Sequence, residues 1–280
     1  MSLYQAVAEL EAQNGRAVLC TIVHSRGATP RHTASKMLVY PDGRTLGSVG
    51  GGELENRVIA EAMLALEDGN PRLLEYGMAD PARGDPGICG GQVEVYLEPV
   101  LPKPSVVVIG AGHVGKAVAH LAHWLGFYVI ASDDRPGLCT PQSLPDADAW
   151  YPLPMPELPA QIDLDRWTAI VLTTRGSDVD VAGLPALLNT PAAYIGVIGS
   201  RRRWEITRRQ LLEKGVAAEQ LARVRSPIGL ELNAETPEEI AVSILAEILM
   251  LKLGGHGGEM SSPGTGGAQK VSPRPSGPAT

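Results

Sequence analysis

The stretch Val106-Val-Val-Ile-Gly-Ala-Gly-His-Val-Gly115 decides the fold of this chain. Its first four residues are all apolar, which is typical of a parallel strand buried on both faces. Three glycines then follow in a G-x-G-x-x-G pattern, namely Gly110, Gly112 and Gly115. These glycines permit a tight turn and a close backbone approach to a phosphate, which the N-terminus of the next helix attracts. The strand, the glycine loop and a helix over residues 114–125 together predict a Rossmann-like unit.

Strand and helix patterns alternate beyond the glycine loop. Apolar runs at 127–131, 169–173 and 194–198 predict three more strands, and a helix over 202–214 ends before Gly215. The last helix begins with Thr236 as its N-cap, followed by Pro237 and Glu239, which form a capping sequence. Alternating strand and helix units predict an α/β fold with a doubly wound parallel sheet over residues 105–253.

The first part of the chain has a different pattern. Strands are predicted at 18–23, 36–40 and 92–97, a helix at 53–67, and a turn at 40–44 in which Gly43 takes a positive φ. We therefore predict a smaller α+β domain over residues 1–101. The proline-rich segment 100–105 separates the two domains as a stiff linker.

Length and composition exclude several classes of protein. The chain of 280 residues carries 24 basic and 31 acidic side chains, a net charge of −7 that argues against a nucleic-acid partner. Its longest apolar-rich stretch, 240–253, is shorter than the roughly 20 residues of a membrane-spanning helix. Three widely spaced cysteines and the lack of a signal-peptide pattern predict a reduced, cytoplasmic protein. The Gly/Pro-rich residues 254–280 are predicted to be a disordered tail.

Four side chains near the predicted carboxyl edge of the parallel sheet are candidate ligand contacts. Asp133 ends the second strand, near the position where an acid binds a ribose in Rossmann folds. His113, within the glycine loop, either touches a ligand or caps the helix. Arg201 and Arg202 follow the fourth strand, where they either bind phosphate or carboxylate groups or form a solvated helix face.

Two glycine-rich loops of the first domain are further candidates. Gly50, Gly51 and Gly52 precede Glu53 at a helix start, which indicates either a binding loop with a carboxylate at its end or an ordinary acidic helix start. Cys89 lies beside two glycines, where a thiol is either inert or a ligand for a soft metal and a carrier of sulfur. The residues show no Ser-His-Asp arrangement, so no catalytic residue is predicted.

Seven motifs in a fixed order resemble those of the XdhC/CoxI family, the accessory proteins of xanthine dehydrogenase and related molybdenum hydroxylases. The likeness extends over about residues 5–253. The motifs are GATPRHTASKML at 27–38, GSVGGGELE at 47–55, ICGGQVEVYLEP at 88–99, VIGAGHVG at 108–115, DDRPG at 133–137, YIGVIGSRRR at 194–203 and SPIGLELNAETPEEIAVSILAEI at 226–248.

The resemblance implies an XdhC/CoxI domain followed by a Rossmann domain, in a protein that binds molybdenum cofactor. It also implies that a cysteine desulfurase supplies sulfur to the bound cofactor, that the cofactor passes to the dehydrogenase, and that the protein is a homodimer. Cys89 becomes the natural soft ligand or sulfur relay. Many CoxI-like members have cysteine at the position of Glu53 and histidine at that of Ser177, so this chain departs from them there.

Two other interpretations stay open. One is an NAD(P)-dependent oxidoreductase that uses the glycine loop and Asp133, although no proton donor for hydride transfer is evident. The other is a nucleotide-responsive scaffold that recruits the desulfurase to the dehydrogenase through the helix at 237–253. Stoichiometric NAD(P)H binding with hydride transfer would favour the first, and partner binding altered by nucleotide, with no molybdenum in the protein, would favour the second.

Overall fold

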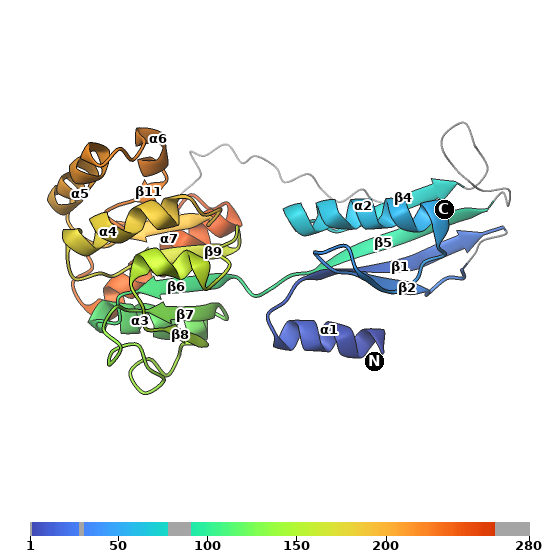
Figure 1. The fold of residues 1–280 in the computed structure, drawn as a ribbon, viewed down its shortest axis with the longest axis horizontal. Coiled ribbons are helices and arrows are strands. Elements are labelled where there is room, and N and C mark those ends of the chain that lie inside the picture. The colour runs from blue at the N-terminus through green and yellow to red at the C-terminus, as the bar shows by residue number, and fades with distance from the viewer. Residues whose placement is uncertain (1, 28–30, 78–90, 261–280) are drawn as a thin grey trace. The chain divides into compact units, whose positions relative to one another are not determined.

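A computed structural model describes residues 2–27, 31–77 and 91–260 of the chain. The chain divides into two compact units, Met1–Pro104 and Ser105–Thr280. Each unit contains its own sheet, as Figure 1 shows.

Within its described residues, the first unit is a five-stranded antiparallel sheet with two α-helices. Its sheet has the order β3-β2-β1-β5-β4. The elements are α1 (Leu3–Ala12), β1 (Ala17–Arg26), β2 (Lys36–Val39), β3 (Thr45–Gly47), α2 (Gly52–Asp68), β4 (Arg72–Gly77) and β5 (Gln92–Val100). Alternate residues of β5 are buried, as expected of a strand with one face on a core. That core lies between the sheet and α2 and includes Cys20, Ile22 and Val58.

The second unit is a six-stranded parallel sheet in the order β11-β10-β9-β6-β7-β8. Its strands are β6 (Ser105–Ile109), β7 (Tyr128–Ser132), β8 (Ala149–Tyr151), β9 (Thr168–Leu172), β10 (Tyr194–Val197) and β11 (Val224–Arg225). Its helices are α3 (His113–Trp124), the 3₁₀ helix η2 (Met155–Ala160), α4 (Ser177–Leu188), α5 (Arg201–Glu213), α6 (Ala218–Leu221) and α7 (Pro237–Leu253). This is the strand order of a Rossmann fold, so the predicted fold class is confirmed.

Both faces of the parallel sheet are covered by helices. Val106 and Val108 of β6 point into a core shared with α3 and α7, whereas Val107 and Ile109 point into a core shared with η2 and α4. Because both faces of β6 are buried, residues 106–109 of this strand are all apolar. The strand order reverses between β6 and β9, and ligands of such sheets bind beyond the carboxyl ends of the strands at that point.

Several elements were not predicted from the sequence. The strands β8 and β11 have three and two residues, which is too short for any periodicity to be visible. The helix α4 contains Gly183 and Pro185 and is apolar on most sides because it lies deep in the unit, so it lacks the polar face that marks a surface helix. The predicted capping sequence of α7 is confirmed, with a hydrogen bond from the Glu239 amide to the Thr236 side chain.

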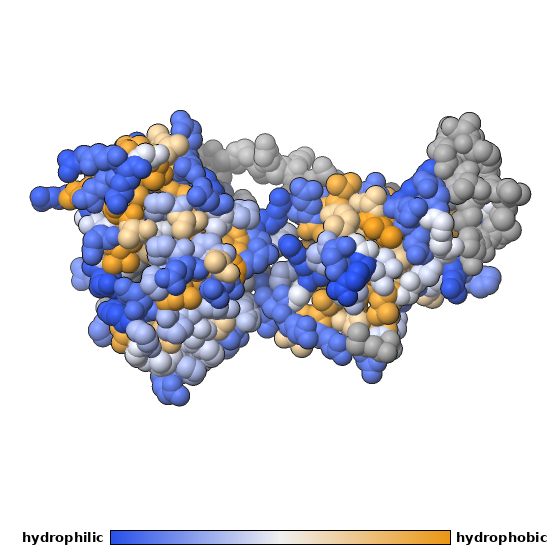
Figure 2. Space-filling model, viewed as in Figure 1, coloured by the Kyte–Doolittle hydropathy of each residue, from blue (hydrophilic) through white to orange (hydrophobic). Residues whose placement is uncertain are grey.

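Hydrophobic side chains are interspersed with hydrophilic ones on the visible face of each unit (Figure 2). Scattered apolar residues of this kind are normal on a protein surface. Within the described residues, no helix has both the length and the apolar character needed to cross a bilayer. Of the predicted tail, residues 254–260 are exposed and 261–280 lie outside the described part of the chain.

Candidate functional site

The glycine loop joins the carboxyl end of β6 to the N-terminus of α3. Gly110 has φ +111°, and a Cβ atom there would lie 2.5 Å from the Thr173 carbonyl oxygen. A Cβ atom on Gly115 would overlap the Gly110 carbonyl oxygen. Gly112 differs, since a Cβ there would meet no described atom within 4 Å. Packing therefore requires Gly110 and Gly115, whereas Gly112 leaves open space into which a ligand can approach the backbone.

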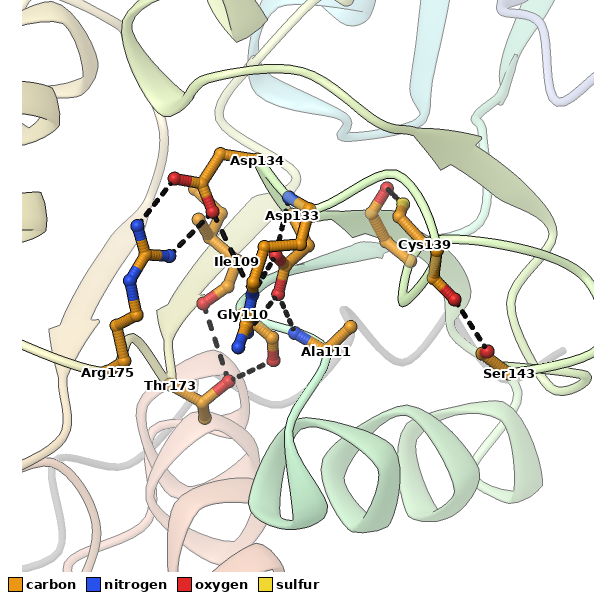
Figure 3. Close-up of polar contacts among 12 residues, drawn as sticks. Ile109, Gly110, Ala111, Asp133, Asp134, Cys139, Ser143, Thr173 and Arg175 are labelled. Atoms are coloured by element: carbon orange, nitrogen blue, oxygen red, sulfur yellow. Dashed lines mark hydrogen bonds and ion pairs between the residues drawn. The ribbon is translucent and has the colours of Figure 1, made fainter.

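Asp133 is buried directly beside the glycine loop. One carboxylate oxygen accepts the Ala111 amide at 2.7 Å (Figure 3). Both oxygens accept Arg135 guanidinium N–H groups at 2.8 Å. Burial raises the pKa of Asp133, but the hydrogen bonds from Arg135 and the Ala111 amide outweigh it and bring this pKa to about 2. The sequence predicted a ribose-binding acid here. In the structure this carboxylate links the loop to Arg135.

A second arginine–aspartate pair lies next to the first. Arg175, in the segment after β9, donates to both oxygens of Asp134 at 2.6 and 2.8 Å (Figure 3). The guanidinium hydrogen bonds from Arg175 hold the pKa of Asp134 below its usual value. Such two-point pairing fixes the plane of the guanidinium group as well as its position. Both pairs therefore present oriented cations at the carboxyl edge of the sheet.

The two ion pairs border a pocket of about 260 Å³ at this edge. Its floor and walls are apolar and come from the end of β6, the segment around η2 and the first turns of α4. The apolar lining consists of Ile109, Leu153, Pro154, Met155, Pro156, Val179 and Ala182. The polar lining is provided by Gly110, Asp133, Asp134, Arg135, Thr174, Arg175 and Asp178. An apolar cavity with a few oriented polar groups is the usual form of a small-molecule site.

A buried hydrogen-bond network lies at the same edge of the sheet, between the end of β9 and the starts of α4 and α5. Asp180 of α4 has no exposed surface and accepts hydrogen bonds from the Thr174 hydroxyl and, at 2.6 Å, from Arg203. Arg203 also donates to the Thr174 hydroxyl at 2.9 Å. The network ties the first turns of α4 and α5 to the end of β9. The sequence indicated Arg203, with Arg201 and Arg202, as a candidate for binding phosphate or carboxylate groups, but its pairing with Asp180 was not predicted, because the two residues are 23 positions apart.

The other predicted contacts of this unit lie elsewhere. Arg201 and Arg202 are exposed at the start of α5, and neither is among the described residues that line the pocket. His113 is the first residue of α3 and lines a separate groove between α3 and the start of α7, together with Lys116 and His120. The sequence predicted a ligand contact for His113 and phosphate or carboxylate binding for Arg201 and Arg202, and all three side chains lie outside this pocket.

The glycine-rich loop of the first unit has an unusual backbone. Gly50, Gly51 and Gly52 all have positive φ, at 140°, 75° and 61°. The carboxylate of Glu55 accepts the Ser48 hydroxyl at 2.7 Å and the Gly51 amide at 3.0 Å, so it holds the loop in this shape. The predicted Glu53 is exposed and pairs with Arg57 at 3.2 Å. Glu55 therefore shapes the loop, whereas Glu53, the predicted binding carboxylate, lies at the surface of the helix start.

The cysteines divide into two groups. Cys89, the predicted soft ligand, lies outside the described residues. Cys20 and Cys139 are buried, and burial raises the pKa of both thiols, that of Cys20 to about 12. Both are therefore neutral thiols at physiological pH and poor ligands or nucleophiles. Within the described residues, no three His, Cys, Asp or Glu side chains come together as a metal site would require.

Comparison with protein families gives two matches that together include most of the chain. The model described as XdhC Rossmann domain matches residues 106–248, and the model described as XdhC and CoxI family matches residues 10–77. The match to the Rossmann-domain model lies in the second structural unit, and the match to the XdhC and CoxI model lies in the first unit.

Three curated relatives show the same likeness. The chain is 38% identical to "Uncharacterized protein YqeB" of Escherichia coli (strain K12), over 94% of this chain and 48% of that protein. It is 33% identical to a probable xanthine dehydrogenase subunit of Bacillus subtilis (strain 168), over 56% of this chain and 46% of that protein. It is 26% identical to "Molybdenum cofactor insertion chaperone PaoD" of E. coli, over 85% and 84%. The chain thus spans about half the length of the first two relatives.

Proposed function

This chain belongs to the XdhC and CoxI family, and on that premise we propose that it is an accessory protein that binds molybdenum cofactor for a molybdenum hydroxylase. The observation that carries the proposal is the match to a relative named as a molybdenum cofactor insertion chaperone, which extends along 85% of this chain and 84% of that one. A second relative is named as a probable subunit of xanthine dehydrogenase.

Two features of the structure, one in each unit, support a carrier of a phosphate-bearing cargo. In the first unit, Cβ atoms on Gly51 and Gly52 would meet no described atom within 4 Å, so the backbone at the start of α2 is open to a ligand. In the second unit, the carboxyl-edge pocket offers apolar walls with two oriented guanidinium groups. A pterin cofactor combines a flat ring with a phosphate, and the pocket of the second unit by itself offers contacts of both kinds.

The finer steps of the proposal concern sulfur and partners. Cys89 is the proposed soft ligand or sulfur relay, a cysteine desulfurase is the proposed sulfur donor, and xanthine dehydrogenase or a related hydroxylase is the proposed recipient. We also propose that the protein acts as a homodimer. The neutral, buried thiols of Cys20 and Cys139 favour Cys89 among the three cysteines for this role.

The geometry favours this role over an NAD(P)-dependent oxidoreductase. A dehydrogenase of this fold uses the acid at the end of the second strand to bind a ribose. Here the carboxylate of Asp133 is already engaged by the Ala111 amide and by Arg135. The pocket of about 260 Å³ also falls just below the ~300–1,000 Å³ typical of small-molecule sites, which is small for a whole dinucleotide.

Reconstitution of a cofactor-free hydroxylase tests the proposal. The protein is purified from cells that make molybdenum cofactor and mixed with cofactor-free xanthine dehydrogenase, and the activity gained is measured. We expect the wild-type chain and the Cys139→Ser variant to activate the enzyme, and Cys89→Ser to give sulfur-free, inactive enzyme. Activation by Cys89→Ser equal to that of wild type would remove this thiol from the mechanism. Absence of activation by the wild-type chain would contradict the accessory role.

A further inference from the structure

We propose that the carboxyl-edge pocket of the second unit binds a planar ring that carries a phosphate ester, with Arg135 and Arg175 as its phosphate contacts. The inference deepens the proposed function and rests on it in part, because a pterin phosphate is one ligand with this chemistry. A nucleoside monophosphate is the other. Neither arginine was singled out as a ligand contact from the sequence.

Both guanidinium groups are held in place yet stay accessible. The Arg135 and Arg175 side chains are 44% and 47% exposed, whereas the carboxylate of Asp133 is 2% exposed. The aspartates therefore act as buried or half-buried anchors, and the arginines form the outer part of each pair. Because the anchors fix the planes of the guanidinium groups, little side-chain entropy is lost when a ligand arrives.

Each arginine keeps N–H donors for a ligand. A guanidinium group has five N–H donors. Arg135 gives Asp133 one hydrogen bond from Nε and one from Nη2, and Arg175 gives Asp134 one from each Nη atom. The remaining donors can meet phosphate oxygens without breaking either ion pair. Two neighbouring arginines match the doubly charged, tetrahedral shape of a phosphate better than a single ammonium group would.

The rest of the pocket fits the ring. Its apolar side chains, among them Leu153, Met155 and Val179, provide flat contact surface for a heterocycle. Asp178, in the first turn of α4, adds an acceptor for a ring N–H or a hydroxyl group of the ligand. The helices α3 and α4 both begin at this edge, and their N-terminal partial charges favour the phosphate. The volume of about 260 Å³ suits one ring with its phosphate.

Calorimetric titration with adenosine monophosphate and with adenosine tests the phosphate contacts. The variants are Arg175→Ala and Arg135→Lys, and the latter keeps the charge but loses the planar fork. The control is Arg209→Ala, which removes an exposed arginine of α5 paired only loosely with Glu213. Because each variant removes charge-assisted hydrogen bonds to the phosphate, it should weaken monophosphate binding about tenfold or more. The control should leave it unchanged, and adenosine binding should change less than twofold in every variant.

Pterin content distinguishes the two sources of the phosphate. The same variants are purified from cells that make molybdenum cofactor, and pterin per chain is measured after oxidation to its fluorescent form. Loss of pterin in both pocket variants assigns the pocket to the pterin, whereas loss of monophosphate binding with unchanged pterin assigns it to a nucleotide. Either result supports the proposal. If neither ligand binds the wild-type chain, or both bind all variants equally, the proposal is wrong, whereas the accessory role is judged separately by activation of the hydroxylase.

Discussion

At the scale of single residues, the buried carboxylate of Asp133 links the stability of the second unit to pH. Its folded pKa of about 2 lies below the usual 3.8 of an aspartate, so the ionised form is favoured by folding. The resulting stability is fully present above pH 3.8 and is lost as the pH falls through 2. From the size of the shift, we expect Asp133→Asn to lower the free energy of unfolding at pH 7 by about 2 kcal/mol.

Urea unfolding at several pH values checks this expectation. The wild type should lose more stability than Asp133→Asn between pH 5 and pH 2, because only the wild type has this carboxylate to protonate. Asp42→Asn is the matched control, since Asp42 is an exposed aspartate paired with Arg44 and such pairs add little. Equal pH profiles for wild type and Asp133→Asn would show that the buried ion pair does not stabilise the fold.

The glycines of the loop have two different roles. Gly110 and Gly115 are required by packing, whereas Gly112 leaves space for a ligand. Gly115→Ala should destabilise the protein by several kcal/mol, because its Cβ would overlap the Gly110 carbonyl oxygen. Gly112→Val should leave the melting temperature nearly unchanged, since the new side chain enters open space, but it should weaken phosphate binding at the helix N-terminus. Thermal unfolding and ligand titration of both variants test this. A stable Gly112→Val variant with full ligand affinity would limit the glycine pattern to a structural role.

At this scale, the sequence predicted which residues lie beside the glycine loop better than it predicted their hydrogen-bond partners. The sequence pointed to Asp133 and to the loop glycines, because the strand–loop–helix pattern fixes where they lie. It missed Arg175 and Asp180, because their partners Asp134 and Arg203 are distant in the sequence. It also missed Arg135, although its partner Asp133 is only two residues away. The sequence instead favoured Arg201 and Arg202, which follow β10 and are exposed at the start of α5.

At the scale of elements, the start of α2 depends on one carboxylate. Glu55 accepts the Ser48 hydroxyl and the Gly51 amide, whereas Glu53 forms a surface pair with Arg57. We expect Glu55→Ala to cost about 1–3 kcal/mol and to speed hydrogen exchange of the glycine amides, because two donors lose their acceptor. Glu53→Ala should change stability by less than about 0.5 kcal/mol. Chemical unfolding and amide exchange measure both, and equal effects of the two changes would contradict the anchoring role of Glu55.

The helix α7 is held to the sheet by a buried glutamate. Glu247 accepts the Tyr194 hydroxyl at 2.5 Å, the Gly229 amide at 3.0 Å and Arg225 at 3.2 Å. Burial and the bond to this carboxylate raise the pKa of Tyr194 far above its usual value. Glu247→Ala should therefore destabilise the second unit by about 2–4 kcal/mol, whereas exposed Glu238 on the same helix should cost under about 1 kcal/mol when changed to alanine. Urea unfolding would refute the assignment if both variants behaved alike.

The sequence predicted elements with strong local patterns and missed those without them. The capping sequence at Thr236 and the apolar run at 106–109 were sufficient to place α7 and β6. By contrast, α4 was missed because Gly183 and Pro185 interrupt a helix that the surrounding core stabilises. The first helix, α1, was also missed, although Ser2 and Gln5 form a capping box at its start. Its apolar residues, among them Leu3 and Val7, pack on a small cluster that includes Leu38.

At the scale of the whole molecule, the last 27 residues should be dispensable. The helix α7 ends at Gly254, which takes the left-handed conformation of a C-cap, and the described residues beyond it are exposed. A chain cut after Leu253 should therefore keep the melting temperature and the hydroxylase activation of the full chain. Thermal unfolding and the reconstitution assay check this. A clear loss of activation with unchanged stability would show that the tail takes part in the function.

The central claim is that the chain carries molybdenum cofactor, and the amount of cofactor on the purified protein tests it most directly. The protein is isolated from cells that make the cofactor and, as a control, from cells that cannot, and pterin, molybdenum and nucleotide are measured per chain. We predict close to one pterin per chain in the first preparation and none in the second. Nucleotide without pterin in the first preparation would contradict the account and would favour a nucleotide-responsive scaffold or an oxidoreductase.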